Sequence, residues 1–397
     1  MAYSSVWLKK NEDHRLKQGH LWIYSNEIDV SKSPLKQFQS GEMVQILNAQ
    51  GKSLGLGYIN PHTLLAARLL TRSNTPFDQI EIISRIRQAL VLRERLYAKP
   101  YYRLIYGESD FLPGLIVDRY ADLLVVQITT AGMERLQSAV IEALVSVIQP
   151  KSILLRNDHS MRALEGLPEQ VIPAWGSPPE EVVLEENQVA FCIDPWKGQK
   201  TGWFYDHRDN RARLKPLVAG KRVLDLFSYV GGWAIQAAVA GAESVCAVDS
   251  SAAALERLQH NAKLNRVEER VRTLQGDVFE QLKQLAQDAA LFDVIIIDPP
   301  AFIKKRKDLN AGLLAYRRVN ELALRLLAPE GLLVSASCSQ HLSAEALRDV
   351  VLQAGLKRNY TLQLIAQGHQ GGDHPIHLAI PETEYLKALF MRAGRFE

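Results

Sequence analysis

The stretch "VLDLFSYVGGWAI" (residues 223–235) decides the fold of the carboxyl-terminal half of this chain. It reads as an apolar strand with one acidic residue, followed by a turn of small residues that opens a helix. From about residue 220 onward strands alternate with helices, and this order predicts an α/β, Rossmann-like domain with a parallel sheet covered on both faces. We predict strands at 222–227, 244–249, 271–276, 292–298 and 331–337, main helices at 251–265 and 309–328, and a final edge strand at 384–392.

The first part of the chain reads as short strands. "GEMVQILNAQGKSLGLGYIN" (41–60) predicts a hairpin that turns at Asn48–Gly51. Gly55 and Gly57 alternate in the second strand, which indicates a backbone that is closely approached or sharply bent. With a further strand at 66–70, the stretch predicts a small β-barrel-like module.

A mixed pattern follows and predicts an α+β middle domain. Its expected elements are a helix at 73–97, strands at 112–120 and 123–129, a helix near 132–148 and a strand at 152–157. The Pro/Gly-rich stretch 173–181 marks a boundary, after which a hairpin at 181–193 leads into the last domain. We therefore expect three domains, at 1–72, 73–178 and 179–397.

Composition sets the class of protein. The 397 residues are 47% hydrophobic and 23% charged, with no apolar run of membrane-spanning length and no signal-peptide plan at the start. The three cysteines are widely spaced, which fits neither a disulfide framework nor a zinc knuckle. We expect a reduced, cytoplasmic protein without a membrane partner.

Charge is unevenly distributed. The first 105 residues contain seven lysines and eight arginines against eight acidic residues, although the whole chain has a net charge of only +3. A basic front on a mildly acidic body suggests contact with a polyanion, and a solvated surface is the alternative. We predict RNA backbone contacts from four residues, Lys9, Lys10, Arg15 and Lys17.

Acidic residues stand in or at the ends of three successive strands of the predicted sheet, where ligands bind in open α/β folds. Asp225 can accept from an ammonium group, Asp249 can hold two ribose hydroxyls, and Asp277 can accept from an adenine amino group. Gly231 and Gly232 allow a bound molecule to approach the backbone closely. Because no G-x-G-x-x-G loop is present for a pyrophosphate, an adenosine carrying an amino acid fits better than NAD, which predicts S-adenosylmethionine as the cofactor.

The fourth strand ends in Asp298-Pro299-Pro300. Proline holds the preceding residue in an extended conformation, so Asp298 forms a stiff acidic tip that can move a proton on a base. Phe302 could stack on an extruded base, and Lys304 and Lys305 begin a basic run that is either a phosphate patch or a solvated loop.

The fifth strand ends at Cys338, within "VSASCSQHLS" (334–343). Carbon 5 of a pyrimidine accepts a methyl group only after a nucleophile has added to carbon 6, and a thiolate can make that addition. Beside Asp298, this position favours a catalytic cysteine over a small buried one, with Ser337 and Ser339 as helpers that favour the thiolate. We assign Cys192 and Cys246 to burial.

Several motifs resemble those of the bacterial RNA cytosine-5 methyltransferases of the large ribosomal subunit. The similar stretches are "VLDLFSYVGGW", "DPPAF" and "SCSQH" in the last domain, "GHLWIYSNEI" (19–28) and "GLGYINP" (55–61) in the first, "GESDFLPGLIVDRY" (107–120) in the middle, and "KGQKTGWFYDHRDNR" (197–211) and "DHPIHLAIPETEYLK" (373–387) beyond it.

The resemblance implies an amino-terminal PUA module and a class I methyltransferase domain that methylates carbon 5 of a cytosine in 23S rRNA or a large-subunit precursor. It implies Cys338 as the nucleophile and Asp298 as the residue that assists proton transfer. The expected cofactor contacts are Asp225, Phe227, Ser228, Gly231, Gly232, Asp249, Ser250, Asp277, Val278 and Asp298.

One departure from the wider pattern concerns product release. Where those enzymes place a second cysteine after the strand-end proline, this chain has Ala301, so another group must help release the product. Three matters stay open: methylation of a guanine or an exocyclic amine, a non-catalytic RNA-binding or assembly role, and a homodimer. We expect no metal, because the histidines at 369, 374 and 377 lack a matching cysteine or carboxylate set.

Overall fold

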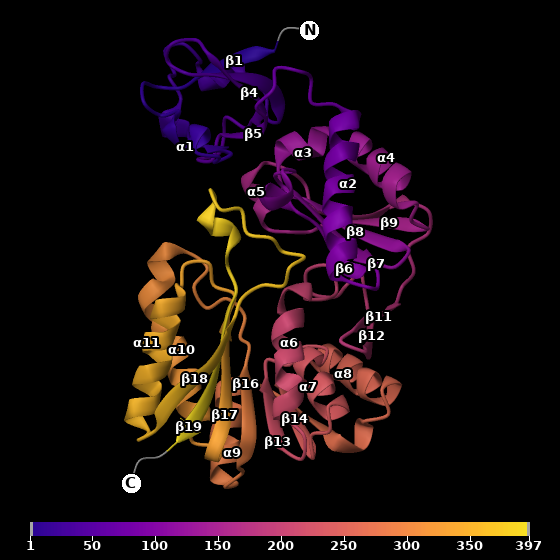
Figure 1. The fold of residues 1–397 in the computed structure, drawn as a ribbon, viewed down its shortest axis with the longest axis vertical. Coiled ribbons are helices and arrows are strands. Elements are labelled where there is room, and N and C mark those ends of the chain that lie inside the picture. The colour runs from indigo at the N-terminus through magenta and orange to yellow at the C-terminus, as the bar shows by residue number, and fades with distance from the viewer. Residues whose placement is uncertain (1–2, 395–397) are drawn as a thin grey trace. The chain divides into compact units, whose positions relative to one another are not determined.

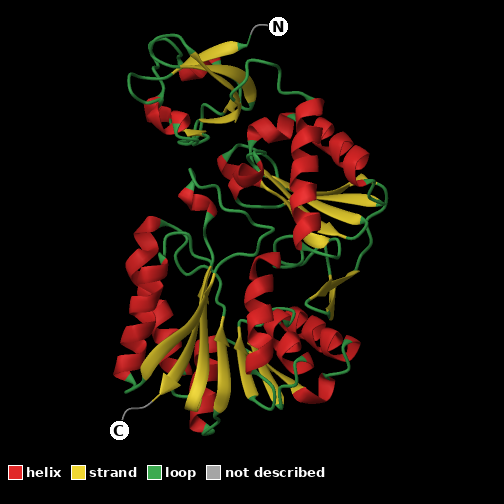
Figure 2. Cartoon of the chain, in the orientation of Figure 1, coloured by secondary structure: helices red, strands yellow, loops and turns green. Residues whose placement is uncertain are grey.

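The computed structural model describes residues 3–394, and its contacts group them into two compact units. The first unit contains the described residues up to Val182 together with Asp194–Trp203 and Gly372–Thr383. The second contains Val183–Ile193, Phe204–Gly371 and the described residues from Glu384 on. Figures 1 and 2 show the elements of each unit.

The first unit begins with a five-stranded sheet in the order β1-β3-β4-β5-β2, built from β1 (Ser4–Trp7), β2 (Trp22–Ile23), β3 (Glu42–Leu47), β4 (Ser53–Ile59) and β5 (Ala67–Thr71). Along the chain, helix α1 (His14–Lys17) comes between β1 and β2. The predicted hairpin is confirmed as β3 and β4, and Asn48 closes its turn by accepting from the backbone N–H groups of Gln50 and Lys52. A side chain at Gly55 or Gly57 would collide with the carbonyls of Thr71 or Arg68 on β5, so the expected close backbone approach is confirmed.

The same unit contains a second five-stranded sheet in the order β10-β9-β8-β7-β6. Its strands are β6 (Tyr101–Tyr106), β7 (Leu115–Tyr120), β8 (Leu123–Ile128), β9 (Ser152–Asn157) and β10 (Gln170–Trp175). Its helices are α2 (Gln79–Leu96), α3 (Ala131–Arg135), α4 (Gln137–Ile148) and α5 (Met161–Leu164). Asp78 caps α2 by accepting from the N–H groups of Ile80 and Glu81, so the helix starts later than the predicted residue 73. The single helix predicted near 132–148 is two helices, and strand β10 was not predicted.

The predicted hairpin is formed by β11 (Val182–Glu186) and β12 (Val189–Ile193), and all of it except Val182 belongs to the second unit. The second unit continues through α6 (Arg208–Leu214) into a seven-stranded sheet. The strand order is β15-β14-β13-β16-β17-β19-β18. The strands are β13 (Arg222–Leu226), β14 (Ser244–Asp249), β15 (Val271–Gln275), β16 (Phe292–Ile297), β17 (Leu327–Ser337), β18 (Thr361–Gly368) and β19 (Lys387–Gly394). The first five run parallel, as predicted.

Helices cover both faces of this sheet (Figure 1). Leu224, Ile295 and Leu333 share one core with helices α9 (Val278–Gln287), α10 (Leu309–Ala323) and α11 (Ala344–Lys357). Asp225, one residue along from Leu224, points to the opposite face and bonds to α7 (Gly232–Val239), which packs against α8 (Ala252–Leu264). Alternate side chains of a strand face opposite sides of the sheet, so the apolar residues of each strand are buried under helices on both faces.

Two predictions for this sheet are wrong. The last strand, predicted as an edge at 384–392, is β19 and lies between β17 and β18. The edge is β18, which the sequence concealed because most of its side chains are exposed. Helix α10 also ends well before residue 328, because β17 already begins at Leu327.

Among residues 3–394, no helix is both long enough and apolar enough to cross a membrane.

Candidate active site

Asp225 is fully buried in β13. Its Oδ2 accepts from the N–H of Ala234 at 3.0 Å, whereas Oδ1 has no partner among the described residues. Burial, reinforced by the nearby Asp298 and Asp249 carboxylates, raises the pKa of Asp225 well above its ordinary 3.8. A buried carboxylate oxygen without a donor is well suited to a cationic ligand.

The turn after β13 contains several residues in the left-handed region. Phe227 and Tyr229 have φ of 63° and 48°, and Gly231, just before α7, has φ of 91°. A side chain on Gly231 would press on Leu258 and Ile235, so only glycine fits there. Ser228 is buried, and its Oγ has no hydrogen-bond partner within residues 3–394. Non-glycine residues at positive φ are strained, and such residues cluster at ligand sites.

Asp249 and Asp277 end β14 and precede α9. Asp249 accepts the Tyr229 N–H at 2.8 Å on Oδ2 and the Ser251 N–H at 2.9 Å on Oδ1, which fixes the carboxylate while leaving lone pairs for ribose hydroxyls. Asp277 caps α9 through Oδ1, which accepts from Phe279 and Glu280. Asp277 and Ser250 are exposed, whereas Val278 is packed in the core.

Asp298 stands at the end of β16 and meets two side chains that the sequence did not single out. Trp233 Nε1 donates to Oδ2 at 2.9 Å, and His207 Nε2 lies 3.1 Å from Oδ1. Burial pushes the pKa of Asp298 upward, but the charge and hydrogen bond of His207 and the bond from Trp233 outweigh it, so the pKa is lowered. The tip is therefore held as an ionised acceptor.

Cys338 follows β17 directly and is partly exposed, unlike Cys192 and Cys246, which are buried as predicted. Its Sγ lies 3.9 Å from the carbonyl oxygen of Pro299, so the thiol and the Asp298-Pro299 tip converge. The hydroxyls of Ser337 and Ser339 both form hydrogen bonds with the hydroxyl of the buried Tyr316, at 2.8 and 2.9 Å.

Lys387 is a further residue near the thiol that the sequence did not indicate. It is buried on β19, directly opposite Ser337, and its ammonium donates to the carbonyls of Ser339 and Tyr385 at 2.8 and 2.9 Å. Burial lowers the pKa of Lys387, although the nearby Cys338 raises it in part. Lys387 also lines a cavity of about 470 Å³, together with Gln340, Glu345, His369 and Glu384.

The predicted base-stacking and phosphate residues follow Asp298. Phe302 is half-buried and packs against three other rings, with its centroid 4.8 Å from that of Tyr316, 6.1 Å from that of Phe227 and 6.4 Å from that of Phe279. Lys304 and Lys305 are exposed.

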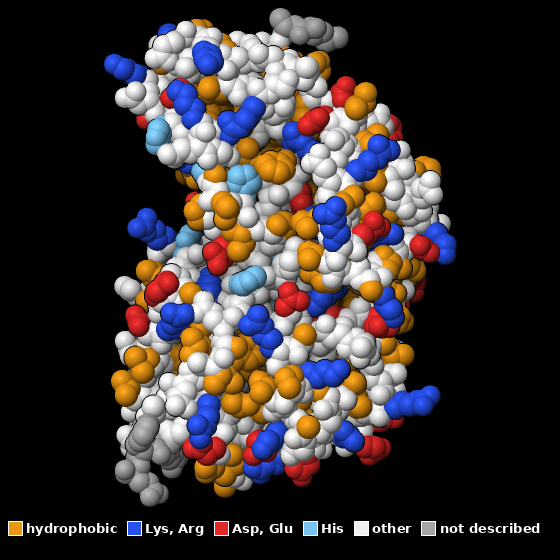
Figure 3. Space-filling model, viewed as in Figure 1, with side chains coloured by type: hydrophobic (Ala, Val, Ile, Leu, Met, Phe, Trp, Pro, Cys, Tyr) orange, Lys and Arg blue, Asp and Glu red, His pale blue; other side chains and the backbone are white. Residues whose placement is uncertain are grey.

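The four predicted RNA-binding cations of the first unit are in two different situations. Lys9 and Lys10 are exposed, although Lys9 Nζ also donates to the carbonyl of Asn26 at 2.7 Å. Arg15 and Lys17 form ion pairs with Glu27 and Asp13, at 2.5 and 2.6 Å. On the face drawn in Figure 3, lysine and arginine side chains are spread over the amino-terminal region with acidic ones among them.

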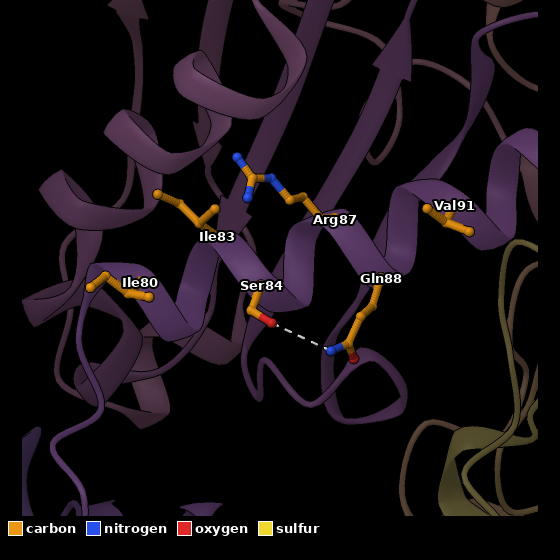
Figure 4. A pocket seen from close by; sticks show the side chains of 6 residues that line it. All are labelled: Ile80, Ile83, Ser84, Arg87, Gln88 and Val91. Carbon is orange, nitrogen blue, oxygen red and sulfur yellow. Dashed lines mark hydrogen bonds between the residues drawn. The ribbon is translucent and has the colours of Figure 1, made fainter.

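The histidines at 369, 374 and 377 do not form a metal site, and a hollow on α2 does not contain a set of catalytic groups. His374 lies 2.8 Å from Asp373, and no group of three or more His, Cys, Asp or Glu suited to a metal occurs in residues 3–394. The hollow, of about 730 Å³, is in the first unit, and its sides come from one helix (Figure 4). Its only drawn hydrogen bond joins Gln88 to Ser84.

Comparison with known families agrees with this arrangement. The family model of the PUA-like domain matches residues 6–72, and that of the S-adenosylmethionine-dependent methyltransferases matches residues 146–375. These matches confirm the predicted PUA module, the cofactor and the methyltransferase fold of the α/β domain.

Curated relatives span almost the whole chain. "Ribosomal RNA large subunit methyltransferase I" of Aliivibrio fischeri (strain MJ11) is 36% identical over 394 residues, covering 98% of this chain and 99% of the relative. The protein of the same name from Vibrio cholerae serotype O1 (strain ATCC 39541) is 35% identical over 390 residues, covering 96% and 98%.

Solved structures show the same fold at lower identity. SMU.776, crystallised in complex with SAH, superposes with a TM-score of 0.84 at 19% identity and covers 99% of this chain and 100% of its own. Trm5b from Pyrococcus abyssi superposes with a TM-score of 0.53 at 18% identity, over 70% of this chain and 74% of its own.

Proposed function

Because the chain belongs to the ribosomal RNA large subunit methyltransferase I family, we propose that it methylates carbon 5 of a cytosine in 23S rRNA or its precursor through a covalent cysteine adduct. The proposal makes the PUA-like module an RNA-binding part, with Lys9, Lys10, Arg15 and Lys17 at the phosphate backbone, and places the enzyme in the cytoplasm with its substrate.

The strand-end residues suit S-adenosylmethionine, which supplies an electrophilic methyl group when bound. The unpartnered Asp225 Oδ1 and Ser228 Oγ offer acceptors for the ammonium of its amino-acid part. Asp249, with both oxygens oriented by backbone N–H groups, would accept from the ribose hydroxyls. Oδ2 of Asp277, which is not used in capping α9, would accept from the adenine amino group.

Cys338 would activate the base. Its thiolate adds to carbon 6, which forms a C–S bond and moves the electron pair of the double bond toward carbon 5, where the methyl group is then received. A base then takes the carbon 5 proton, with the ionised Asp298 assisting the transfer, and this restores the double bond and expels the thiolate. Asp298 would hold the pyrimidine edge during both steps.

The observation that supports this function best is the 3.9 Å approach of Cys338 Sγ to the Pro299 carbonyl, on a side chain that is partly exposed. A buried structural cysteine, such as Cys246, has no such access.

The test compares two cysteines in a strain from which the gene has been deleted. Complementation with the wild type or with Cys246→Ala should restore 5-methylcytidine in 23S rRNA, and Cys338→Ala should not, with the rate in vitro lowered by at least ~10³-fold because the covalent route is lost. Nucleoside mass spectrometry measures the modification, and calorimetry should show that Cys338→Ala still binds S-adenosylmethionine. Persistence of 5-methylcytidine in Cys338→Ala, or loss of a methylated guanine instead, would contradict the proposal.

A further inference from the structure

The Asp298 carboxylate is held from two sides by side chains far away in sequence. Trp233 donates from α7, and His207 approaches from the segment before α6, where its ring also packs edge-on to Trp233 with centroids 5.4 Å apart. His207 is buried, and its Nε2 makes no well-aligned hydrogen bond with any described residue, although it lies 3.1 Å from Asp298 Oδ1.

Asn210 determines which nitrogen of His207 carries the proton. The Asn210 side chain lies 3.2 Å from His207 Nδ1 and donates its Nδ2 to the backbone carbonyl of His369 at 3.1 Å. A carbonyl only accepts, so the group facing it is the NH₂, and the same NH₂ donates to Nδ1. When the ring is neutral, this network places its proton on Nε2, the nitrogen that faces Asp298.

We propose that His207 is a positioning residue that, together with Trp233, presents the Asp298 carboxylate as a hydrogen-bond acceptor for the exocyclic amine of the target base, and so makes the site prefer cytosine over uracil. This inference rests on the proposed function and adds its base selectivity. Cytosine offers an N4 amine to a carboxylate, whereas uracil offers the O4 acceptor at the same place, which an ionised acid repels.

The charges around Asp298 explain why the donors are needed. Asp206 and Asp225 both oppose a negative charge on Asp298, and burial opposes it as well. His207 and Trp233 are the groups that hold the pKa of Asp298 down. If His207 is lost, only Trp233 opposes burial and the two acids, so the pKa of the carboxyl rises and a larger share of it is protonated. The protonated form donates a hydrogen bond, which suits uracil O4.

The 3.1 Å contact of His207 with Asp298 does not have the alignment of an ideal hydrogen bond. Contacts of this kind often tighten when substrate binds. Each ring faces a different oxygen of Asp298, and a carboxylate oxygen can accept more than one hydrogen bond, so lone pairs remain for a ligand.

The first measurement needs no RNA. Proteins with ¹³C-labelled aspartate carboxyls are titrated by NMR, with Asp298→Asn assigning the signal. We expect the midpoint of Asp298 below 3.8 in the wild type, at least ~1 pH unit higher in His207→Leu, and close to the wild type in His207→Gln, whose amide can still donate. If His207→Leu does not fold, Trp233→Phe removes the other donor and should raise the midpoint as well. An unmoved midpoint in the folded variants would overturn the proposal.

The second measurement uses RNA with cytidine or uridine at the methylated position. His207→Leu should reduce the preference for cytidine by about tenfold or more and move the acidic limb of the rate profile to higher pH, and His207→Gln should restore both in part. A preference unchanged in His207→Leu would overturn the role in selectivity. If no 5-methylcytidine forms even in the wild type, the proposed function fails, while the carboxyl titration still decides whether His207 controls Asp298.

Discussion

The paired arginines of the first unit and the Asp225 site of the second unit use buried charge in opposite ways. In the first unit, buried arginines are matched by acids: Arg93 binds Asp110 through two bonds of 2.6 and 2.7 Å, and Arg103 binds Asp118 through two of 2.8 Å. In the second unit, the buried Asp225 keeps one oxygen without a donor. A satisfied charge stabilises the fold once its partner is present, whereas an unsatisfied one costs stability and is retained where a ligand completes it.

The burial of these arginines also corrects the expectation that the basic residues in the first 105 positions form a surface for a polyanion. Four of the arginines counted in the first 105 residues, Arg68, Arg85, Arg93 and Arg103, are buried in ion pairs or bonded to carbonyls. They hold the unit together and cannot meet an RNA backbone. The cationic surface is therefore smaller than the composition suggests.

The largest effect should come from breaking a satisfied pair. Arg93→Met leaves Asp110 charged and buried, and also removes donors to the carbonyls of Arg103 and Asp373, so the free energy of unfolding should fall by about 3–5 kcal/mol. Urea denaturation measures the change. Arg392→Gln, which removes an arginine from an exposed pair with Glu330, is the control and should cost at most about 1 kcal/mol. Equal losses in the two variants would show that the buried pair contributes no more to stability than an exposed one.

Removing an unsatisfied charge should affect binding instead. Asp225→Asn should weaken S-adenosylmethionine about 10–100-fold, because a charge-assisted bond to the ammonium is lost, while the free energy of unfolding changes by less than ~1 kcal/mol. Asp293→Asn is the matched control: it lies on the neighbouring strand but bonds to Arg222, so cofactor affinity should be kept. Calorimetry and urea denaturation give the two quantities. A large loss of stability without loss of affinity in Asp225→Asn would make Asp225 a structural residue.

Much of the second unit's site could be predicted from the sequence. The spacing of apolar residues and the turn residues locate the strand ends of the parallel sheet, and the acids stand near those ends. As expected, Asp225 lies within β13 near its end, and the residues at or just beyond strand ends are Asp249, Asp277, Asp298 and Cys338. His207 and Trp233 could not be found this way: they contact Asp298 from 91 and 65 residues away in sequence, and nothing in their local pattern shows it.

Strand β18 and the pairing of the arginines were missed for a related reason. An exposed edge strand lacks the apolar run that marks its neighbours, and an arginine in the interior looks the same in sequence as one at the surface.

The contrast should also appear in the pH dependence of cofactor binding. The pKa of Asp225 is raised in the free protein, and a cationic ligand favours its ionised form, so affinity should fall as pH drops below that pKa, by up to about tenfold per pH unit. The free fold behaves oppositely: it binds this proton more tightly than the unfolded chain does, so the Asp225 contribution to stability grows as pH falls toward 3.8. Calorimetry in buffers of different ionisation enthalpy should detect proton release on binding in the wild type and less of it in Asp225→Asn. Equal release in both would show that another group titrates.

The smallest effect should come from single exposed cations, because each contributes one phosphate contact at most. Lys10→Gln should weaken RNA binding about two- to fivefold and lower the slope of log affinity against log salt by about 0.7, the value for one contact to a single strand. Lys151→Gln is the control, since Lys151 is also exposed but lies outside the PUA-like module and pairs with Asp122. Lys17→Gln should give a response between these two, because Asp13 already neutralises part of its charge. Filter binding of rRNA fragments over a range of salt concentrations measures all three variants, and an identical slope in Lys10→Gln and Lys151→Gln would mean that the exposed cations of the module do not contact the backbone.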